Sequence, residues 1–316
     1  MSSPSLATRT MEAFWGLIDP YLFMGLSASF LPRTLKTIFL SGSPLTALRT
    51  LLSPSRFQDA WFSHFWSHVG PDIRENAGAN VLPLLDGRTD KGRVVLEGEA
   101  PLREGLGGVV VEIGPGAGFW VDVFSDEKQI YVEGKEKRPD TARTPITHVY
   151  GVEPNASHHP ALRRAVAAAG LQEIYEIVPV GIEELSSSPS SSSASSSKKK
   201  WDGNIEPGSV DCVVSILCLC SIPEPERNIR EIYKLLRPGG RWYVYEHVRC
   251  EFSWYMRLHQ RIVNFFWPTF IGGCTLCRPT EKSLRAAGPW TSINIGQPPA
   301  EPWYHTLPHV LGVFTK

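Results

Sequence analysis

One short stretch, VVVEIGPGAGFW at residues 109–120, combines an acidic residue with glycines at alternate positions. Glu112 sits in an otherwise apolar run and is followed by Gly114, Gly116 and Gly118. Alternate glycines let a backbone turn approach a ligand closely at the start of a helix. A carboxylate beside this turn would repel a phosphate and attract a cation. The stretch therefore indicates a site for a positively charged small molecule.

Two cofactors compete for a turn of this kind. Dinucleotide-binding turns follow the pattern GxGxxG, which would require a glycine where this chain has Phe119. The pattern here is GxGxG, and a pyrophosphate gains nothing from Glu112. S-adenosylmethionine carries a sulfonium group, an ammonium group and no phosphate. These residues therefore favour S-adenosylmethionine over a nicotinamide dinucleotide.

A second acid, Glu153, ends the next expected strand, ITHVYGVEP at residues 146–154. It follows Gly118 at more than the separation of about 20 residues that is usual after a dinucleotide turn. A charged insertion at residues 126–145 accounts for the additional length. We expect Glu153 to bind the ribose hydroxyls of the cofactor. The alternative is that it only opens the following helix, where negative charge is favourable.

A sheet must hold these acids and glycines in place. From residue 108 onward, strand and helix patterns alternate, which is typical of a doubly wound, mainly parallel sheet. Ligands bind such sheets at the carboxyl ends of the strands, where the glycines lie. We predict an α/β fold with seven strands. They are expected at 109–113, 146–154, 174–181, 209–220, 241–248, 292–297 and 309–316.

Helices are expected between these strands. One opens at Phe119 and continues to about Ser125, and a second spans residues 155–170, entered at Asn155. A third, PEPERNIREIYKLL, ends where Arg-Pro-Gly-Gly cannot continue a helix.

Several segments lie outside this alternation. Residues 1–10 are expected to form a disordered tail, and residues 11–85 a helical extension. Residues 126–145 are expected to be a surface insertion. Residues 186–200, which are mostly serine followed by lysine, are expected to be a disordered loop.

The apolar stretch MEAFWGLIDPYLFMGLSASFL, at residues 11–31, is interrupted by Asp19 and Pro20. A spanning helix needs about 20 uninterrupted apolar residues, so the interruption predicts two short helices instead. One interpretation packs these helices on the domain. The other places residues 11–52 in a membrane surface.

Composition excludes some other functions. The formal net charge is zero, which gives no electrostatic footprint for nucleic acid.

Without a secretory signal, the six cysteines indicate reduced thiols in a cytoplasmic protein. Cys274 and Cys277 have zinc half-site spacing, but no second pair and no suitably spaced histidine accompanies them, so we predict no metal. His64 and His68 share a helical face without the HExxH pattern, which favours packing.

Several motifs together resemble the class I S-adenosylmethionine-dependent methyltransferases. They are VEIGPGAG, GVEP, GSVDCVVSILCLCSI, LLRPGGRWYVYEHV and HVLGVFTK. The segment from DCVV onward is similar to membrane-associated small-molecule thiol methyltransferases and their fungal relatives, through LRPGG, EHV, GGC and HVLGV. The resemblance covers residues 105–316 and implies a Rossmann-like methyltransferase domain at residues 86–316. Family members carry an apolar N-terminal anchor, which makes the membrane interpretation of residues 11–52 as strong as the packing interpretation.

The resemblance implies roles for the first two strand ends. Glu112 would approach the ammonium group of the cofactor, partly through water. Gly114, Gly116 and Gly118 would bring the backbone close to it, and Glu153 would bind the ribose hydroxyls.

It also implies roles for later strand ends. Gly181, Ile182 and Glu183 would flank the adenine. Many relatives have an aspartate at the position of Gly181 that contacts the adenine amino group, so this contact would need Glu183 or backbone here. Leu217 and Cys218 would lie near the sulfonium.

The acceptor is expected beyond the fifth strand of the sheet. Glu246 and His247 would point toward it, with His247 as the base or orienting donor. The alternative is a histidine that is hydrogen-bonded at the sheet margin. His259 is the second candidate, and Trp254 belongs to an aromatic segment, residues 251–270, that suggests a lipophilic acceptor.

We therefore predict an S-adenosylmethionine-dependent methyltransferase that acts on a sulfur, oxygen or nitrogen atom of a lipophilic small molecule. The resemblance favours a thiol or the tailoring of a fungal secondary metabolite. The alternatives are a nicotinamide-dependent oxidoreductase on the same fold and a non-catalytic, membrane-associated binding protein. If residues 11–52 are an anchor, we expect peripheral binding to the endoplasmic reticulum or to lipid droplets.

Overall fold

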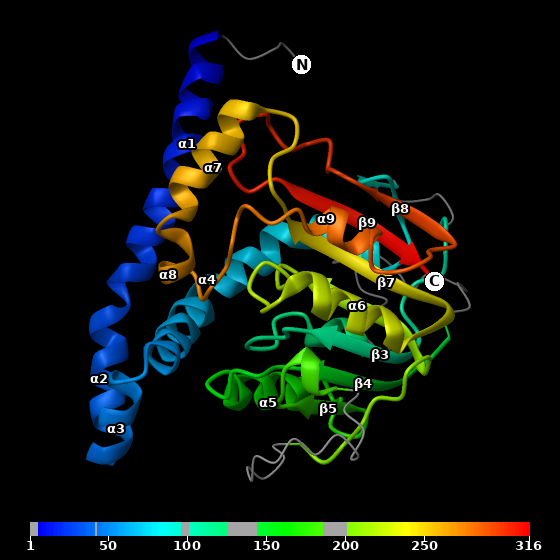
Figure 1. The fold of residues 1–316 in the computed structure, drawn as a ribbon, viewed down its shortest axis with the longest axis horizontal. Helices are drawn as coiled ribbons and strands as arrows, with labels where there is room; N and C mark the ends of the chain where they lie inside the picture. The colour runs from blue at the N-terminus through cyan, green and yellow to red at the C-terminus, as the bar shows by residue number, and fades with distance from the viewer. Residues whose placement is uncertain (1–5, 42, 96–100, 126–143, 186–200) are drawn as a thin grey trace.

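A computed structural model describes residues 6–41, 43–95, 101–125, 144–185 and 201–316. Within these residues a central sheet is flanked by helices, and the N-terminal helices run along one side of the molecule (Figure 1).

Three expected features lie wholly or partly outside the described residues. They are residues 1–5 of the N-terminal tail, residues 126–143 of the charged insertion and the serine-rich loop at residues 186–200.

The main sheet of the described chain has seven strands in the order β5-β4-β3-β6-β7-β9-β8. The strands β5, β4, β3, β6 and β7 are parallel, and β9 and β8 are antiparallel to their neighbours. This confirms the predicted doubly wound, mainly parallel sheet. The strands are β3 (Gly108–Ile113), β4 (Ile146–Val152), β5 (Tyr175–Val178), β6 (Val210–Ile216), β7 (Leu236–His247), β8 (Ser292–Gly296) and β9 (His309–Thr315). A separate small hairpin pairs β1 (Thr89–Asp90) with β2 (Arg93–Val94).

The central strands are buried because apolar clusters cover both of their faces. Val110 packs into one cluster and Val111 into the other, as alternating side chains must. Register sets Ile113 opposite both Val152 and Ser215, so β3, β4 and β6 reach the same edge. That edge carries the carboxyl ends of the strands and positions the site.

Helices flank the sheet. They are α4 (Pro54–Leu85), α5 (His159–Ala168), α6 (Pro225–Leu235) and α9 (Thr280–Arg285), with 3-10 turns η1 (Val121–Phe124) and η2 (Ile182–Glu184). The helix expected from Phe119 is only the short η1, because Ser125 returns to extended backbone. The second expected helix begins at His159, because Asn155 forms a local turn in which its side-chain oxygen accepts the amide of Ser157.

Three further helices form the N-terminal part of the described chain. They are α1 (Leu6–Ser29), α2 (Leu31–Ser41) and α3 (Pro44–Leu51). Figure 1 shows α1 and α2 as a long rod at the left, with α7 (Trp254–Asn264) and α8 (Trp267–Phe270) beside α1.

Two predictions about this region are wrong. Residues 6–10 belong to α1 instead of a disordered tail, and α1 runs through Asp19 and Pro20 without a break. Proline removes one helical hydrogen bond, but tertiary contacts hold both sides of it. Pro20 itself is buried, and the Ser27 hydroxyl donates to the carbonyl of Phe270.

Continuity through Pro20 gives the chain a longer apolar helical stretch than the sequence pattern suggested. Thr10–Leu40 is long and apolar enough to cross a membrane by length and composition, and 17% of its most apolar window is buried. This property alone is weak support for a membrane segment.

Candidate functional site

The glycine turn, defined here as Gly114–Gly118, follows β3 directly. Gly114, Gly116 and Gly118 have φ values of 65°, 58° and 86°, in a region that favours glycine. A Cβ on Gly118 would lie 2.6 Å from the Cβ of Ala165. A Cβ on Gly114 would lie 2.8 Å from the Cβ of Cys218. Conformation and close packing thus both require glycine here.

Glu112 is buried at the end of the central strand, with 3% of its surface exposed. Its Oε2 accepts a hydrogen bond of 2.5 Å from the hydroxyl of Tyr175 on β5. Burial raises the pKa of Glu112 to about 7, although the Tyr175 hydrogen bond opposes this increase. The acid is therefore poised to ionise near neutral pH.

Glu153 follows β4 and contacts the glycine turn directly. Its Oε2 accepts the backbone amide of Gly116 at 2.9 Å, and its Oε1 accepts that of Asn155 at 2.8 Å. Burial raises the pKa of Glu153 to about 7, and these two amide bonds oppose the increase. The two strand ends thus bring Glu112, Glu153 and the glycine turn into one site.

The donor set fits a cationic ligand that also has hydroxyl groups. The partners of the two carboxyl groups are a phenol and backbone amides, and neither acid forms an ion pair within the described chain. A buried carboxylate without a counter-charge is costly, and a bound cation removes that cost. Glu112 would hold the ammonium of S-adenosylmethionine, and Glu153 its ribose hydroxyls.

Helix α4 holds the glycine turn from the other side. Arg74 donates to the carbonyl of Phe119 at 2.8 Å and to Asp122 at 3.2 Å, and its guanidinium lies 4.1 Å from the ring centre of Trp120. The indole of Trp66 lies 3.4 Å from the position of a Cβ on Gly116. The sequence pattern gave no signal for Trp66 or Arg74, because both reach the turn only through the packing of α4.

The third strand end carries the residues expected near adenine. Gly181 caps η2 in an extended conformation, Ile182 is buried and Glu183 is exposed. Their contact with adenine stays a prediction.

The loop after β6 is tied to the end of β7. Leu217 has a left-handed φ of 54°, which ends β6 earlier than expected. Its amide donates to the carbonyl of Tyr245 on β7 at 2.8 Å. Glu246 is completely buried, and its carboxylate accepts the amides of Cys218 at 3.1 Å and Leu219 at 3.2 Å. Burial raises the pKa of Glu246 to about 8. Glu246 therefore holds this loop, and its contact with an acceptor stays a prediction.

His247 is buried beside two thiols. Its Nε2 lies 3.1 Å from the Sγ of Cys274, and Cys220 belongs to the same group. Cys277, the other member of the zinc half-site spacing, is half-buried and lies outside this group. The partners of Cys274 thus come from distant parts of the chain, where the sequence spacing could not indicate them.

The other expected acceptor residues lie on α7, which Gln260 ties to the segment after β7 through a bond to the carbonyl of Val248 at 3.2 Å. Trp254 is 76% exposed and packs against Tyr255. His259 is half-buried, with Nδ1 3.3 Å from the hydroxyl of Thr306 and its ring 6.0 Å from that of Tyr21 on α1. The structure does not bring Trp254 or His259 to the glycine turn.

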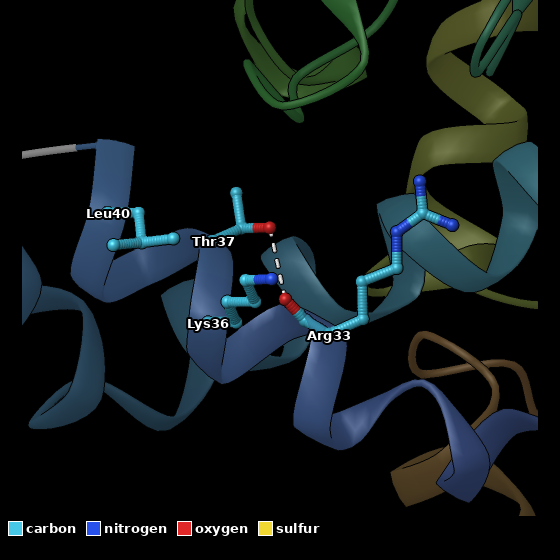
Figure 2. Close-up of a pocket in the computed structure, with 4 residues that line it drawn as sticks. All are labelled: Arg33, Lys36, Thr37 and Leu40. Carbon is cyan, nitrogen blue, oxygen red and sulfur yellow. Dashed lines mark hydrogen bonds between the residues drawn. The ribbon is translucent and has the colours of Figure 1, made fainter.

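A shallow hollow of about 350 Å³ lies elsewhere, on α2. Figure 2 shows its lining residues Arg33, Lys36, Thr37 and Leu40 on successive turns of this helix. None of them comes from a strand end, so this hollow is separate from the site described above.

Comparison with known proteins identifies the family. Residues 89–287 match a family described as a methyltransferase domain, which is more than half of the 316 residues. The chain belongs to this methyltransferase family. The predicted family is confirmed, and S-adenosylmethionine agrees with it as the cofactor.

Curated relatives match a shorter part of the methyltransferase chain. Thiol S-methyltransferase TMT1A of Homo sapiens is 38% identical over 110 residues, which cover 34% of this chain and 45% of the relative. Thiol S-methyltransferase TMT1B of Homo sapiens is 34% identical over 110 residues with the same coverage. The chain thus matches slightly less than half the length of these relatives.

A solved structure shows the same fold. An O-methyltransferase family protein from Burkholderia thailandensis is 13% identical, with a TM-score of 0.50, over 95% of this chain and 71% of that chain. At this identity the likeness concerns the fold alone.

Proposed function

We propose that the protein methylates the sulfur atom of a lipophilic thiol with S-adenosylmethionine as donor. The observation that carries the donor assignment is the pair of buried acids, Glu112 and Glu153, beside the glycine turn. The thiol assignment is supported by the names of the two human relatives, which match 34% of the chain.

The donor residues would act by positioning. S-adenosylmethionine, when bound, supplies an activated methyl group. Ionised Glu112 would hold its ammonium, and Glu153 would exchange contacts with Gly116 and Asn155 for contacts with the ribose. The turn, fixed by Arg74, would keep water out of the site and hold the reacting methyl in one place.

The acceptor side supports a thiol over a phenol or an amine. A thiol has an unperturbed pKa near 8.5 and a phenol near 10, so a thiol needs less assistance to lose its proton. The two side chains expected to act there have other partners, because Glu246 binds backbone amides and His247 faces a thiol. A place in fungal secondary metabolism would rest on the sequence resemblance alone.

The proposal is tested with labelled methyl donor and a matched panel of alkyl thiols, phenols and amines of equal apolar size. We expect labelled thioethers from the thiols and at least about tenfold slower transfer to the other classes. The variant Glu112→Gln with Glu153→Gln is the control for enzyme-dependent transfer. Preferential labelling of a phenol or an amine contradicts the thiol assignment.

We also propose peripheral membrane contact through α1, α2 and α7. These helices expose large apolar side chains next to two exposed cations, Arg33 and Lys36, on α2 (Figure 2). Apolar side chains bordered by cations suit an interface with anionic headgroups. The exposed apolar residues on these helices include Met11, Phe14, Trp15, Leu22, Phe39, Leu40, Trp254, Leu258 and Ile262, and Phe265 and Phe266 follow α7 directly.

Flotation of the full chain with vesicles of neutral and anionic phospholipid tests this contact. We expect the wild type to float and the variant Phe39→Asp with Leu40→Asp to stay at the bottom, because two exposed apolar side chains that would enter the interface become charged. A substitution of an exposed residue outside these helices, Glu226→Gln on α6, serves as control. Absence of wild-type flotation would leave these helices as packing elements, and a cytoplasmic protein would follow instead of one on the endoplasmic reticulum or lipid droplets.

A further inference from the structure

Three buried side chains that could hold a metal meet near the end of β7. We call Cys220, His247 and Cys274 the cysteine–histidine cluster. Their ligand atoms lie within 4.8 Å of one another. Their exposed fractions are 2%, 7% and 4%. They come from the loop after β6, the end of β7 and the loop after α8.

Backbone contacts fix the segments that carry the cluster. The amide of Thr275 donates to the carbonyl of Cys220 at 3.1 Å. Arg278 donates to the carbonyls of Leu219 at 2.8 Å and Ile222 at 2.7 Å. The two cysteine loops are therefore joined before any ligand binds, which lowers the entropic cost of assembling a site.

The surroundings of the cluster suit a metal-bound thiolate. The indole N–H of Trp267 donates to the Sγ of Cys274 at 3.1 Å, and such outer contacts orient metal ligands and stabilise their charge. Apolar side chains of one core cluster surround the thiols and limit access of water. They include Phe65, Val69, Val263, Ile271 and Leu276.

We propose that Cys220, His247 and Cys274 bind a Zn²⁺ ion. Two thiolates and one imidazole are ligands that zinc prefers, and softer sulfur ligands disfavour magnesium and calcium. Three protein ligands leave one tetrahedral position open, as in catalytic zinc sites. Within the described chain, the metal-ligand groupings offer no fourth protein side chain for this cluster.

The open position is the binding place for the acceptor sulfur, a step that rests on the proposed function. Cys220 lies two residues after Cys218, whose Cβ closely approaches Gly114 of the glycine turn, so the cluster adjoins the donor site. On binding, the S–H bond of the acceptor breaks, a Zn–S bond forms and the proton leaves to solvent. The ion thereby holds the acceptor as a thiolate at neutral pH, as it does with other protic ligands.

Metal analysis of the full-length protein tests the site without any activity. Protein from zinc-supplemented cells should contain about one zinc per chain after passage over a chelating resin. We expect Cys220→Ser, Cys274→Ser and His247→Ala each to lose most of it. The matched control is Cys277→Ser, which should keep its zinc because that thiol lies outside the cluster.

Three results would overturn the zinc site. The first is that the wild-type protein neither contains zinc nor takes it up on reconstitution. The second is a Cys220–Cys274 disulfide in the wild-type protein, and the third is equal zinc loss in Cys277→Ser and Cys274→Ser. The wild-type measurements keep the test decisive if a variant fails to fold.

Cobalt substitution tests the open position. We expect an alkyl thiol to increase the thiolate-to-cobalt charge-transfer absorption of the Co²⁺ protein, and an alcohol of equal size to leave it unchanged. An unchanged spectrum with the thiol overturns acceptor binding at the ion. Full thiol methylation by the metal-free protein would also overturn acceptor binding at the ion, but it would leave the proposed function intact. Zinc binding without methylation of any thiol would instead contradict the proposed function.

Discussion

The two ends of the site are assembled in different ways. At the donor end, Glu112 and the glycine turn are neighbours in sequence on one strand and its turn. At the acceptor end, His247 and Cys274 are 27 residues apart, and Cys220 comes from a third segment. The donor end therefore depends mainly on local backbone conformation, with Glu153 added from the neighbouring strand β4, and the acceptor end depends on correct packing of distant loops. Substitutions should affect the two ends differently.

The largest effect is expected at the donor end. Glu112→Gln keeps the shape and removes the charge, so affinity for S-adenosylmethionine should fall about 10–100-fold, as for a lost hydrogen bond to a charged group. Calorimetry measures this directly. The exposed Glu226→Gln on α6 is the matched control and should bind like the wild type. Unchanged affinity of Glu112→Gln would remove the first acid from the site.

The second-largest effect is expected for a substitution in the glycine turn. Gly118→Ala should lower the free energy of unfolding by about 1–3 kcal/mol, because it combines a positive φ with a contact at 2.6 Å to Ala165. The matched control is Gly170→Ala, which has a φ of 71° and open space around its Cβ. Urea denaturation should show a smaller loss for the control. Equal losses would mean that close packing against α5 does not constrain the turn.

A smaller loss of ligand affinity is expected at the acceptor end. Trp267→Phe removes the N–H donated to Cys274 and keeps most of the apolar contact. Zinc affinity should fall about tenfold, as for loss of an outer-shell partner, while affinity for S-adenosylmethionine stays unchanged. Competition with a chromogenic chelator measures the first and calorimetry the second. A parallel loss of both affinities would show that the two ends are not separable.

The smallest effect concerns pH. The pKa of Glu112 is raised to about 7 in the folded protein, mainly by burial, so the carboxyl becomes protonated as the pH falls through 7. Affinity for a cation should fall with it. Tyr175→Phe removes the hydrogen bond that lowers this pKa, so the midpoint should move upward by less than about 1 pH unit.

At pH 7 the Tyr175→Phe variant should therefore bind about threefold more weakly than the wild type, and at pH 9 the two should agree. Calorimetry across this range separates a shifted titration from a damaged site. A deficit that persists at pH 9 would mean that Tyr175 acts through packing instead of through the pKa of Glu112.

The same contrast explains what the sequence could predict. Strand patterns and the alternate glycines predicted the sheet and placed Glu112 beside the turn, because both depend on neighbouring residues. The end of β6 was misjudged, because Leu217 adopts a left-handed backbone conformation that its residue type does not indicate. The continuous α1 was missed for a similar reason, since the contacts that hold Pro20 in a helix are tertiary.

The sequence pattern did not indicate the partners of the site residues. Tyr175 on β5 reaches Glu112 on β3 across the one intervening strand, β4, and Arg74 on α4 reaches Phe119 directly after the turn. Cys274 was considered only with its neighbour Cys277, although its partners in the structure are Cys220 and His247. The spacing of residues in the sequence identifies a site that neighbouring residues form. It does not identify a site whose ligands come together only on folding.

Calorimetry of the full-length protein with S-adenosylmethionine and with NADH tests the central claim most directly, namely that two buried acids at adjoining strand ends receive a cationic, phosphate-free ligand. The account predicts micromolar binding of S-adenosylmethionine that weakens below pH 7 and no measurable binding of NADH. Micromolar binding of NADH without binding of S-adenosylmethionine would contradict it.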